Sequence, residues 1–417
     1  MSFQKMSPSI DKWLLRRIYE SVGCPPIRLK LGNGVEVSST DPAPLATLVI
    51  ENRRILQRLM LDPEAGFGDA YSEGRITVEG DLIAALEALY QSIQKVGRHN
   101  WYSRIMSRCM DYWQRNTLGG SRRNIHQHYD LTTDFYRLWL DPELVYTCAY
   151  FPSVSATLEE AQTAKMDYIC RKLKLQPGER VVDAGCGWGA LALHMAKHYG
   201  VTVRAFNISH EQILWARERA KELKLSDWVE FIEDDYRNIS GRCDAFVSVG
   251  MLEHVGMEHY GELGSIINRS LDNAGRGLLH FIGRNKACPF STWTRKRIFP
   301  GAYAPTIRQA MELFEPWDFS ILDIENLRFH YARTVEIWLS GFEKSAKRVE
   351  KMFGGEFVRA WRLYLAGAVA GFRAGTLQLF QIVFARTACE HIPWTRAHLY
   401  RLEQQEEQEA RWIHTTS

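Results

Sequence analysis

Three glycines closely follow Asp183 and form the strongest chemical signal in the chain. Gly185, Gly187 and Gly189 are spaced G-x-G-x-G rather than the G-x-G-x-x-G of dinucleotide-binding folds. They come at the end of a short apolar segment, residues 180–184, and open α/β sheets bind ligands at the carboxyl ends of such strands. Glycine carries no Cβ, so a ligand can approach this backbone closely. Asp183 would repel a pyrophosphate and suits a cationic amino-acid ligand.

This pattern resembles motif I of S-adenosylmethionine-dependent methyltransferases, although a glycine-rich turn without any ligand is the alternative. Many such enzymes carry an acid after the second strand for the ribose hydroxyls, whereas this chain has Asn207. Asn207, Ser209 and Gln212 could still hydrogen-bond a ribose, and Ser209 could equally be a helix N-cap. Asp235 and Tyr236 follow the third strand, where the adenine usually binds; a solvated polar loop explains them as well.

The elements that must position these residues alternate between helix and strand from about residue 155. Such alternation predicts a mostly parallel sheet with right-handed crossovers. Thr157 and Glu160 have the spacing of a capping box at the start of the first helix. The predicted helices are residues 157–173, 190–199 and 211–223, and the predicted strands are 180–184, 201–206, 229–232, 245–249 and 277–282.

The first 120 residues read as a separate α+β accessory domain that ends in a basic linker at 98–123. Asn33-Gly34 predicts a hairpin within residues 27–37. We expect a catalytic domain at 121–400 and a polar tail at 401–417. The other predicted N-terminal elements are helices at 44–61 and 81–95 and a strand at 75–78.

Several separated segments, in this order along the chain, resemble the cyclopropane-fatty-acyl-phospholipid synthases and the related mycolic-acid cyclopropane synthases. The similarity runs from about residue 121 to about 386. Residues 67–74 also look like the phospholipid-acting branch, which has an N-terminal domain that the mycolic enzymes lack. The segments are residues 124–131, 134–136, 146–151, 251–256, 299–301, 372–373 and 378–381.

The resemblance implies a Rossmann-like methyltransferase fold and a one-carbon transfer from S-adenosylmethionine to the double bond of an acyl chain. The alkene attacks the sulfonium methyl, a carbocation forms, and a bound bicarbonate removes a methyl proton so that the ring closes. By position, Tyr146 and Thr147 would contact the cofactor. The bicarbonate cluster would be Cys148, Glu253, His280, the backbone of Ile282, and Tyr331.

Physical chemistry adds constraints to this implied mechanism. A carbocation needs an apolar, closed pocket, and an anionic base in that pocket needs preorganised donors. Glu253 beside bicarbonate would be a like-charge clash unless the two share a proton. Family members often have a cysteine near the position of Ala368, so a covalent thiolate mechanism is disfavoured here. The His–Glu pairs do not have ligand spacing, and we expect no metal.

Composition excludes other classes. With 52 Lys and Arg against 49 Asp and Glu, the chain is too evenly charged to bind nucleic acid by bulk charge. It has no apolar run of about 20 residues and no secretory signal, and its eight cysteines are scattered. We expect a cytoplasmic protein that contacts the inner face of an anionic membrane, and a homodimer is left open. Basic and aromatic residues at 284–299 are the predicted docking stretch, or else a solvated loop.

Two alternatives share the same motifs. One is a fatty-acyl C-methyltransferase whose product is a methyl or methylene branch, or a furan precursor. The other is a lipid-binding protein that has kept the fold and lost the chemistry.

Overall fold

The computed structural model describes residues 8–38, 43–96, 131–389 and 392–400, and the chain forms two compact units. One unit combines Met1–Leu140, Gly283–Thr306 and Arg328–Leu379; the other combines Asp141–Ile282, Ile307–Leu327 and Phe380–Ser417. The spatial division therefore differs from the single predicted boundary near residue 120, because two later segments rejoin the N-terminal part. The predicted linker at 98–123, residues 124–130 and the predicted tail at 401–417 lie outside the described residues.

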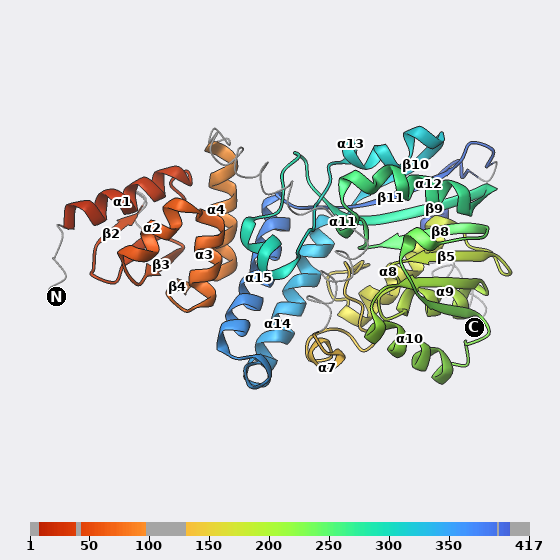
Figure 1. The fold of residues 1–417 in the computed structure, drawn as a ribbon, viewed down its shortest axis with the longest axis horizontal. Helices are drawn as coiled ribbons and strands as arrows, with labels where there is room; N and C mark the ends of the chain where they lie inside the picture. The colour runs from red at the N-terminus through yellow and green to blue at the C-terminus, as the bar shows by residue number, and fades with distance from the viewer. Residues whose placement is uncertain (1–7, 39–42, 97–130, 390–391, 401–417) are drawn as a thin grey trace, which may run out of the picture. The chain divides into compact units, whose positions relative to one another are not determined.

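A small sheet with order β2-β1-β3-β4 forms the N-terminal part of the first unit (Figure 1). The predicted hairpin is confirmed, since β1 and β2 pair antiparallel across Asn33-Gly34. The predicted strand at 75–78 and the helix at 81–95 correspond to β4 and α4. The elements are α1 (Pro8–Ser21), β1 (Arg28–Leu31), β2 (Glu36–Ser38), β3 (Ala46–Ile50), α2 (Arg53–Leu61), α3 (Pro63–Ser72), β4 (Ile76–Gly80) and α4 (Leu82–Val96).

The predicted helix at 44–61 is wrong in its first half, which forms strand β3. β3 pairs in parallel with β1 and antiparallel with β4, and its residues alternate between buried and half-buried. The helix starts only after Asn52, whose side chain accepts hydrogen bonds from the backbone N–H groups of Arg54 and Ile55. Sheet pairing therefore overrides the helical pattern.

Helices α14 (Arg328–Phe353) and α15 (Gly355–Ala374) pack together in the first unit, which also contains the short α7 (Thr133–Tyr136). The predicted docking stretch is absorbed into this packing. Trp293 is buried, and a Cβ on Gly68 would come within 2.2 Å of its ring. Arg295 is also buried, and Arg297 forms an ion pair with Asp69 at 3.0 Å. This part of the stretch ties elements of one unit together, while Lys286, Lys296 and Arg297 stay exposed, so docking by the stretch remains a prediction.

A seven-stranded sheet with order β10-β11-β9-β8-β5-β6-β7 forms the second unit (Figure 1). The pairs β5–β6, β6–β7, β5–β8 and β8–β9 are all parallel, as predicted, and β10 pairs antiparallel with β11. The strands are β5 (Arg180–Ala184), β6 (Thr202–Asn207), β7 (Val229–Glu233), β8 (Cys243–Val249), β9 (Leu271–Gly283), β10 (Phe319–Asn326) and β11 (Gln378–Arg386).

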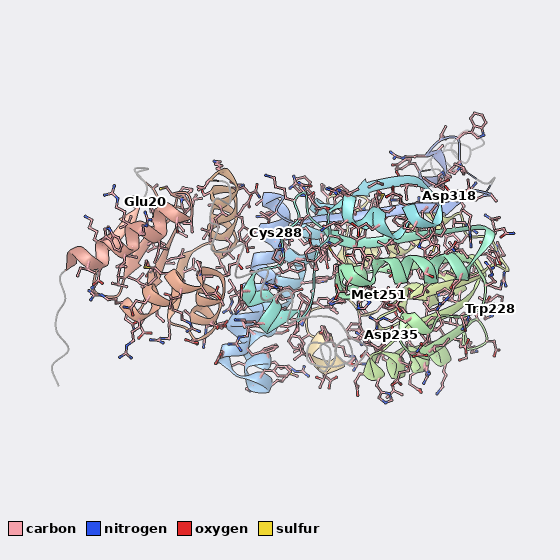
Figure 2. All side chains as sticks on the ribbon, turned by 45° about the horizontal axis from the view of Figure 1, so that its top comes forward. Glu20, Trp228, Asp235, Met251, Cys288 and Asp318 are labelled. Atoms are coloured by element: carbon pink, nitrogen blue, oxygen red, sulfur yellow. The ribbon has the colours of Figure 1, made fainter. Side chains whose placement is uncertain are left out.

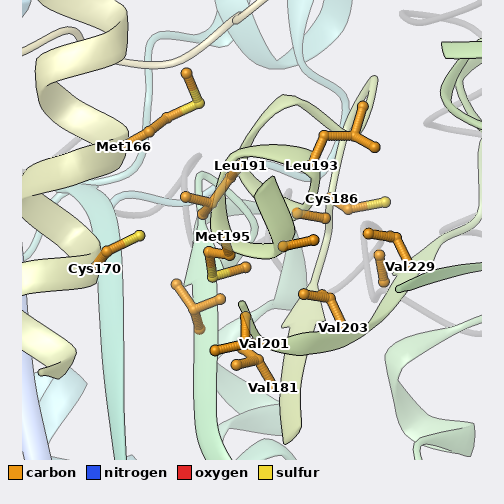
Figure 3. Close-up of a cluster of buried hydrophobic side chains, with 14 of the residues drawn as sticks. Met166, Cys170, Val181, Cys186, Leu191, Leu193, Met195, Val201, Val203 and Val229 are labelled. Atoms are coloured by element: carbon orange, nitrogen blue, oxygen red, sulfur yellow. The ribbon is translucent and has the colours of Figure 1, made fainter. Parts of the chain in front are cut away.

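Helices cover both faces of this sheet. On one face, apolar side chains of α8 (Leu158–Leu173), α9 (Ala190–Tyr199) and α10 (His210–Glu222) form a core with the strands (Figure 3). On the other face lie α12 (Tyr260–Ser270) and the turns near Leu313. The capping box of α8 is confirmed, since Thr157 and Glu160 bond reciprocally. The remaining short helices are α11 (Leu252–Val255) and α13 (Ile307–Ala310).

Strand alternation decides which polar residues share a face. Val181 belongs to the core under α8, whereas Val182 and Ala184 belong to the opposite core. Because successive side chains of a strand point to opposite faces, Asp183 points to the α8 face of β5. Within the described residues, no helix combines the length and apolar character needed to cross a membrane.

Candidate active site

The glycine loop after β5 has two kinds of glycine. All three have positive φ, at +86° for Gly185, +55° for Gly187 and +88° for Gly189. A Cβ on Gly189 would lie 2.6 Å from the Phe231 ring, so this glycine is required by packing. A Cβ on Gly187 would meet no described atom within 4 Å. Gly187 therefore borders open space in which a ligand can contact the backbone.

Asp183 is buried beside this loop with an unsatisfied oxygen. Its side chain is 1% exposed, and Oδ2 has no hydrogen-bond partner among the described residues. Burial raises the pKa of Asp183 to about 7, and the charge of Lys165 limits the rise. A buried carboxylate oxygen without a partner, next to an open glycine, fits a ligand with a cationic group.

Asn207 at the end of β6 holds the loop in place. Its side-chain amide donates to the Gly187 carbonyl at 3.1 Å and to Gln212 Oε1 at 2.7 Å. Its Oδ1 accepts from the backbone N–H of Ser209 at 3.3 Å. Ser209 precedes α10 but makes no side-chain capping bond, and both Ser209 and Gln212 are buried. Asn207 and Gln212 thus bond to each other beside the loop, and a ribose contact of Asn207, Ser209 or Gln212 remains a prediction.

Asp235 and Tyr236 follow β7. Asp235 accepts hydrogen bonds from the backbone N–H of Arg237 at 3.0 Å and from its guanidinium at 3.2 Å, which caps a 3₁₀ turn. This is not the solvated loop of the alternative, because Asp235 is buried. The hydroxyl of Tyr236 is buried and has no partner among the described residues. Of the two, Tyr236 keeps an atom that a ligand could satisfy.

Glu253 lies on α11, directly after β8, and is 5% exposed. Its Oε1 accepts the backbone N–H of Ile282 at 2.5 Å, while Oε2 has no partner in the described chain. Burial raises the pKa of Glu253 to about 7. The Ile282 N–H is thus engaged by Glu253, and a contact of the Ile282 backbone with bicarbonate stays a prediction. Glu253 itself can therefore carry or accept a proton near neutral pH.

His280 on β9 is held in one tautomer by Gln381 on β11. The two are fully buried, and Gln381 Nε2 lies 3.0 Å from His280 Nδ1. Burial, with the charges of Lys165 and Lys172, lowers the pKa of His280 well below its usual value, so the ring is neutral. An amide N–H can only donate, so Nδ1 accepts and the proton sits on Nε2. Nε2 has no partner among the described residues.

Residues 145–148 are fixed against the sheet by α8. Gln162 Nε2 donates to the carbonyls of Val145 and Thr147, and Lys165 Nζ donates to Thr147 Oγ1 at 3.1 Å. A Cβ on Gly250 would lie 3.1 Å from the Thr147 methyl, and the Gly250 N–H donates to the His280 carbonyl at 2.8 Å. Thr147 therefore lies at the carboxyl ends of β8 and β9.

The remaining predicted residues divide between the two units. Cys148 is buried next to Thr147, and its thiol donates to the Ala149 carbonyl at 3.2 Å. Tyr146 is half-buried in the same segment. Tyr331 belongs to α14 in the other unit, where its ring stacks on Phe372 at 4.6 Å. Its place in the cluster stays a prediction.

Met251, which is labelled in Figure 2, lies between the glycine loop and Glu253. A Cβ on Gly185 would come within 3.0 Å of the Met251 side chain, and Met251 is two residues before Glu253. The predicted cofactor loop and the buried carboxyl are thus neighbours at one edge of the sheet. The sequence interpretation assigned no role to Met251, Gln381 or Lys165. A polar residue such as Gln381 within an apolar strand is the signal that could have found it.

Comparisons with known proteins identify the family to which the chain is similar. The family model for mycolic acid cyclopropane synthetases matches residues 117–382. A probable fatty acid methyltransferase of Pseudomonas putida is 32% identical over 396 residues, which cover 90% of this chain and 96% of that protein. The cyclopropane-fatty-acyl-phospholipid synthase of Escherichia coli K12 is 33% identical over 359 residues, covering 85% and 90%.

The solved structure of mycolic acid cyclopropane synthase CmaA1, complexed with SAH and CTAB, superimposes with a TM-score of 0.61 and 30% identity. It covers 63% of this chain and 98% of that one. Fold and site thus define an S-adenosylmethionine-dependent methyltransferase of Rossmann-like architecture with a smaller α+β N-terminal part. Within that class, the chain belongs to the family of mycolic acid cyclopropane synthetases.

Proposed function

We propose that this enzyme converts the double bond of an unsaturated acyl chain in membrane phospholipid into a cyclopropane ring. The observation that carries the proposal is a pair of buried groups, Glu253 and His280, that each keep one polar atom without a described partner. Glu253 follows β8, and His280 lies near the carboxyl end of the neighbouring strand β9. The name and coverage of the E. coli relative support a phospholipid substrate, because the similarity covers 85% of this chain and so extends beyond the residues 117–382 that the family model matches.

The residues present fit S-adenosylmethionine. Asp183 would meet its amino-acid end, the Gly187 backbone would line it, and Ser209, Gln212 and Tyr236 would contact the adenosine. When bound, the cofactor supplies an electrophilic methyl group. Closure of this region against water protects any cation on the acyl chain from hydration.

The chain's own groups would control the proton that ring closure releases. We assign to His280 Nε2–H the donor that holds a bicarbonate, with Cys148 as a second member of the cluster; the part of Tyr331 stays the prediction made from the sequence. Glu253, with a pKa of about 7, would share a proton with that anion and avoid a like-charge clash. Because the Ile282 N–H donates to Glu253, this hydrogen bond would hold the carboxyl in position beside the anion.

A second candidate is a fatty-acyl methyltransferase that leaves a methyl or methylene branch. It is favoured by the P. putida relative, which is about as similar to this chain as the E. coli enzyme. The two candidate functions differ in whether the product still contains a double bond: a cyclopropane does not, whereas a methylene branch does. Lipid mass spectrometry of cells expressing the protein should show acyl chains that gain one CH₂ and resist ozonolysis. A gain of one CH₂ with ozonolysis products would instead identify a methylene branch.

We further propose that α1 contacts an anionic bilayer, in place of the stretch at 284–299. Trp13 is 60% exposed on this helix, between exposed Lys12, Arg16 and Arg17. An exposed tryptophan among basic side chains suits the interface of a negatively charged membrane. Trp13→Ala with Arg17→Gln should weaken sedimentation with phosphatidylglycerol vesicles at low salt. Trp394→Ala, at a fully exposed tryptophan of the other unit, is the matched control. Equal binding of all three proteins would locate docking elsewhere.

A further inference from the structure

Two lysines on the same side of α8 are buried, and they differ in their partners. Lys172 lies 2.6 Å from Glu325 and 3.7 Å from Asp323. Lys165, 2% exposed and two turns earlier, forms no ion pair among the described residues. Its ammonium donates a hydrogen bond to the neutral hydroxyl of Thr147, at 3.1 Å. An ammonium buried without a carboxylate in contact is costly for folding, so stability alone does not explain it.

The surroundings of Lys165 point to the cofactor loop. Strand alternation turns Asp183 and His280 toward the face of the sheet that α8 covers, since Val181 and Leu278 belong to that core. The titratable groups that interact with Lys165 come from four elements around it. They are Asp141 and Cys148 before α8, Asp183 on β5, His194 on α9 and His280 on β9.

Of these groups, Asp183 has an oxygen available to a ligand. Asp141 accepts the backbone N–H groups of Glu143 and Val145. Asp183 thus lies on the same side of the sheet as Lys165 and interacts with its charge, but no ion pair in contact joins the two among the described residues. This arrangement favours the ionised form of Asp183 while leaving its oxygen accessible to another positive group.

We propose that Lys165 is a positioning residue that keeps Asp183 ionised, so that Asp183 can bind the ammonium group at the amino-acid end of S-adenosylmethionine. The inference rests on the proposed role of Asp183. Burial lowers the pKa of Lys165 to about 8, so Lys165 is mostly cationic at pH 7, where Asp183 titrates. Without the cation of Lys165, the pKa of Asp183 is higher. At pH 7 the carboxyl then has to lose its proton before it can bind the ammonium group, which weakens binding.

The test compares two ligands over pH 5.5–8.5 by calorimetry. S-adenosylhomocysteine has the amino-acid end, whereas 5′-methylthioadenosine lacks it. In the wild type, affinity for the first should fall as pH drops below about 7, and affinity for the second should stay flat. Lys165→Met should move the midpoint up by about one to two units, which corresponds to about 5- to 50-fold weaker binding of S-adenosylhomocysteine at pH 7. The deficit should shrink toward pH 8.5, and methylthioadenosine should bind as before.

Lys172→Met is the matched control, because it removes a buried lysine from the same helix. It should lower the melting temperature without moving the midpoint. Equal losses for both ligands at every pH in Lys165→Met would mean a merely structural role and overturn the proposal. So would an unmoved midpoint. If neither Lys165→Met nor Lys165→Gln folds, the wild-type profile decides: no pH dependence for S-adenosylhomocysteine rejects the inference.

Asp183→Asn separates this inference from the site assignment. It should weaken the binding of S-adenosylhomocysteine and abolish the pH dependence of that binding. Adding Lys165→Met to Asp183→Asn should then weaken binding little further, since the two residues act together. If Asp183→Asn changes nothing, the assignment of the cofactor site itself fails. If Asp183→Asn acts as expected while Lys165→Met leaves the midpoint in place, only the role of Lys165 fails. A full Lys165 effect in the Asp183→Asn background would mean that Lys165 meets the ligand directly, which also contradicts the proposal.

Discussion

Replacing Glu253 by Gln should separate catalysis from cofactor binding. The amide keeps an oxygen for the Ile282 N–H and almost the same volume, but it cannot carry the proton of a carboxyl group. A positioned general acid or base is typically worth about 10²–10⁴-fold in rate. We expect turnover to fall within that range, while affinity for S-adenosylmethionine changes by no more than a few-fold, because the lost interaction acts after methyl transfer.

The same substitution should alter stability in a pH-dependent way. The folded-state pKa of Glu253 lies above its unfolded value of 4.5, at about 7, so the native state favours the protonated carboxyl. Its contribution is fully present below pH 4.5 and is lost as pH rises toward 7. The loss amounts to about 2–3 kcal/mol between about pH 5 and 8. A glutamine side chain does not titrate, so urea unfolding of the Glu253→Gln variant should lack this decline.

The assay measures initial rates, cofactor affinity and urea stability for the wild type, Glu253→Gln and the control Glu258→Gln, an exposed glutamate on the next turn. Rates are taken with bicarbonate stripped and then supplied. Wild-type turnover should fall without bicarbonate. Turnover of Glu253→Gln within a few-fold of wild type would refute the role of this carboxyl. If bicarbonate changes the rate of none of the three proteins, its role as proton acceptor is refuted, and Glu253 is left as the direct base.

Substitutions in the glycine loop and at Gln381 should distinguish residues that serve the ligand or catalysis from residues that serve packing. Gly187→Leu should lower S-adenosylhomocysteine affinity at least tenfold with only about 1–2 kcal/mol of destabilisation, because open space surrounds the position; calorimetry and urea unfolding check both. Gly189→Ala should destabilise by more, since its Cβ would lie 2.6 Å from Phe231 and φ is +88°. Equal stability of the two variants would contradict this division. Gln381→Leu should reduce turnover more than cofactor affinity, because His280 loses the partner that fixes its tautomer; a change in affinity alone would argue against that role.

The sequence predicted the strands and helices around the cofactor loop well, because local signals there agree with the tertiary structure. The capping box of Thr157 marks the start of α8, and β5 and α9 begin and end where the pattern places them. Residues 44–61 failed for the opposite reason. An apolar run that suits either element became β3 because two neighbouring strands were available to pair with it.

The site was predictable in its residues but only partly in its connections. Sequence motifs identified Glu253 and Ile282 separately, whereas the hydrogen bond between them depends on the turn after β8. Likewise, the sequence showed the charges of residues 295–297 but not that Arg295 would be buried and Arg297 would pair with Asp69. Contacts between distant segments decide whether a charge faces solvent, and spacing along the chain carries no such information.

Buried polar residues on the strands become interpretable once their partners are counted. Ser248 is as buried as Asp183, but its hydroxyl donates to the Ala184 carbonyl at 2.8 Å, so the fold accounts for it. Asp183, His280 and Gln381 each keep an atom without a described partner and share the sheet face under α8. Unsatisfied polar atoms destabilise a fold unless a ligand completes them. Their convergence at one edge of a parallel sheet therefore locates the chemistry more sharply than any one motif, and it places Lys165 among the groups that a substitution series has to include.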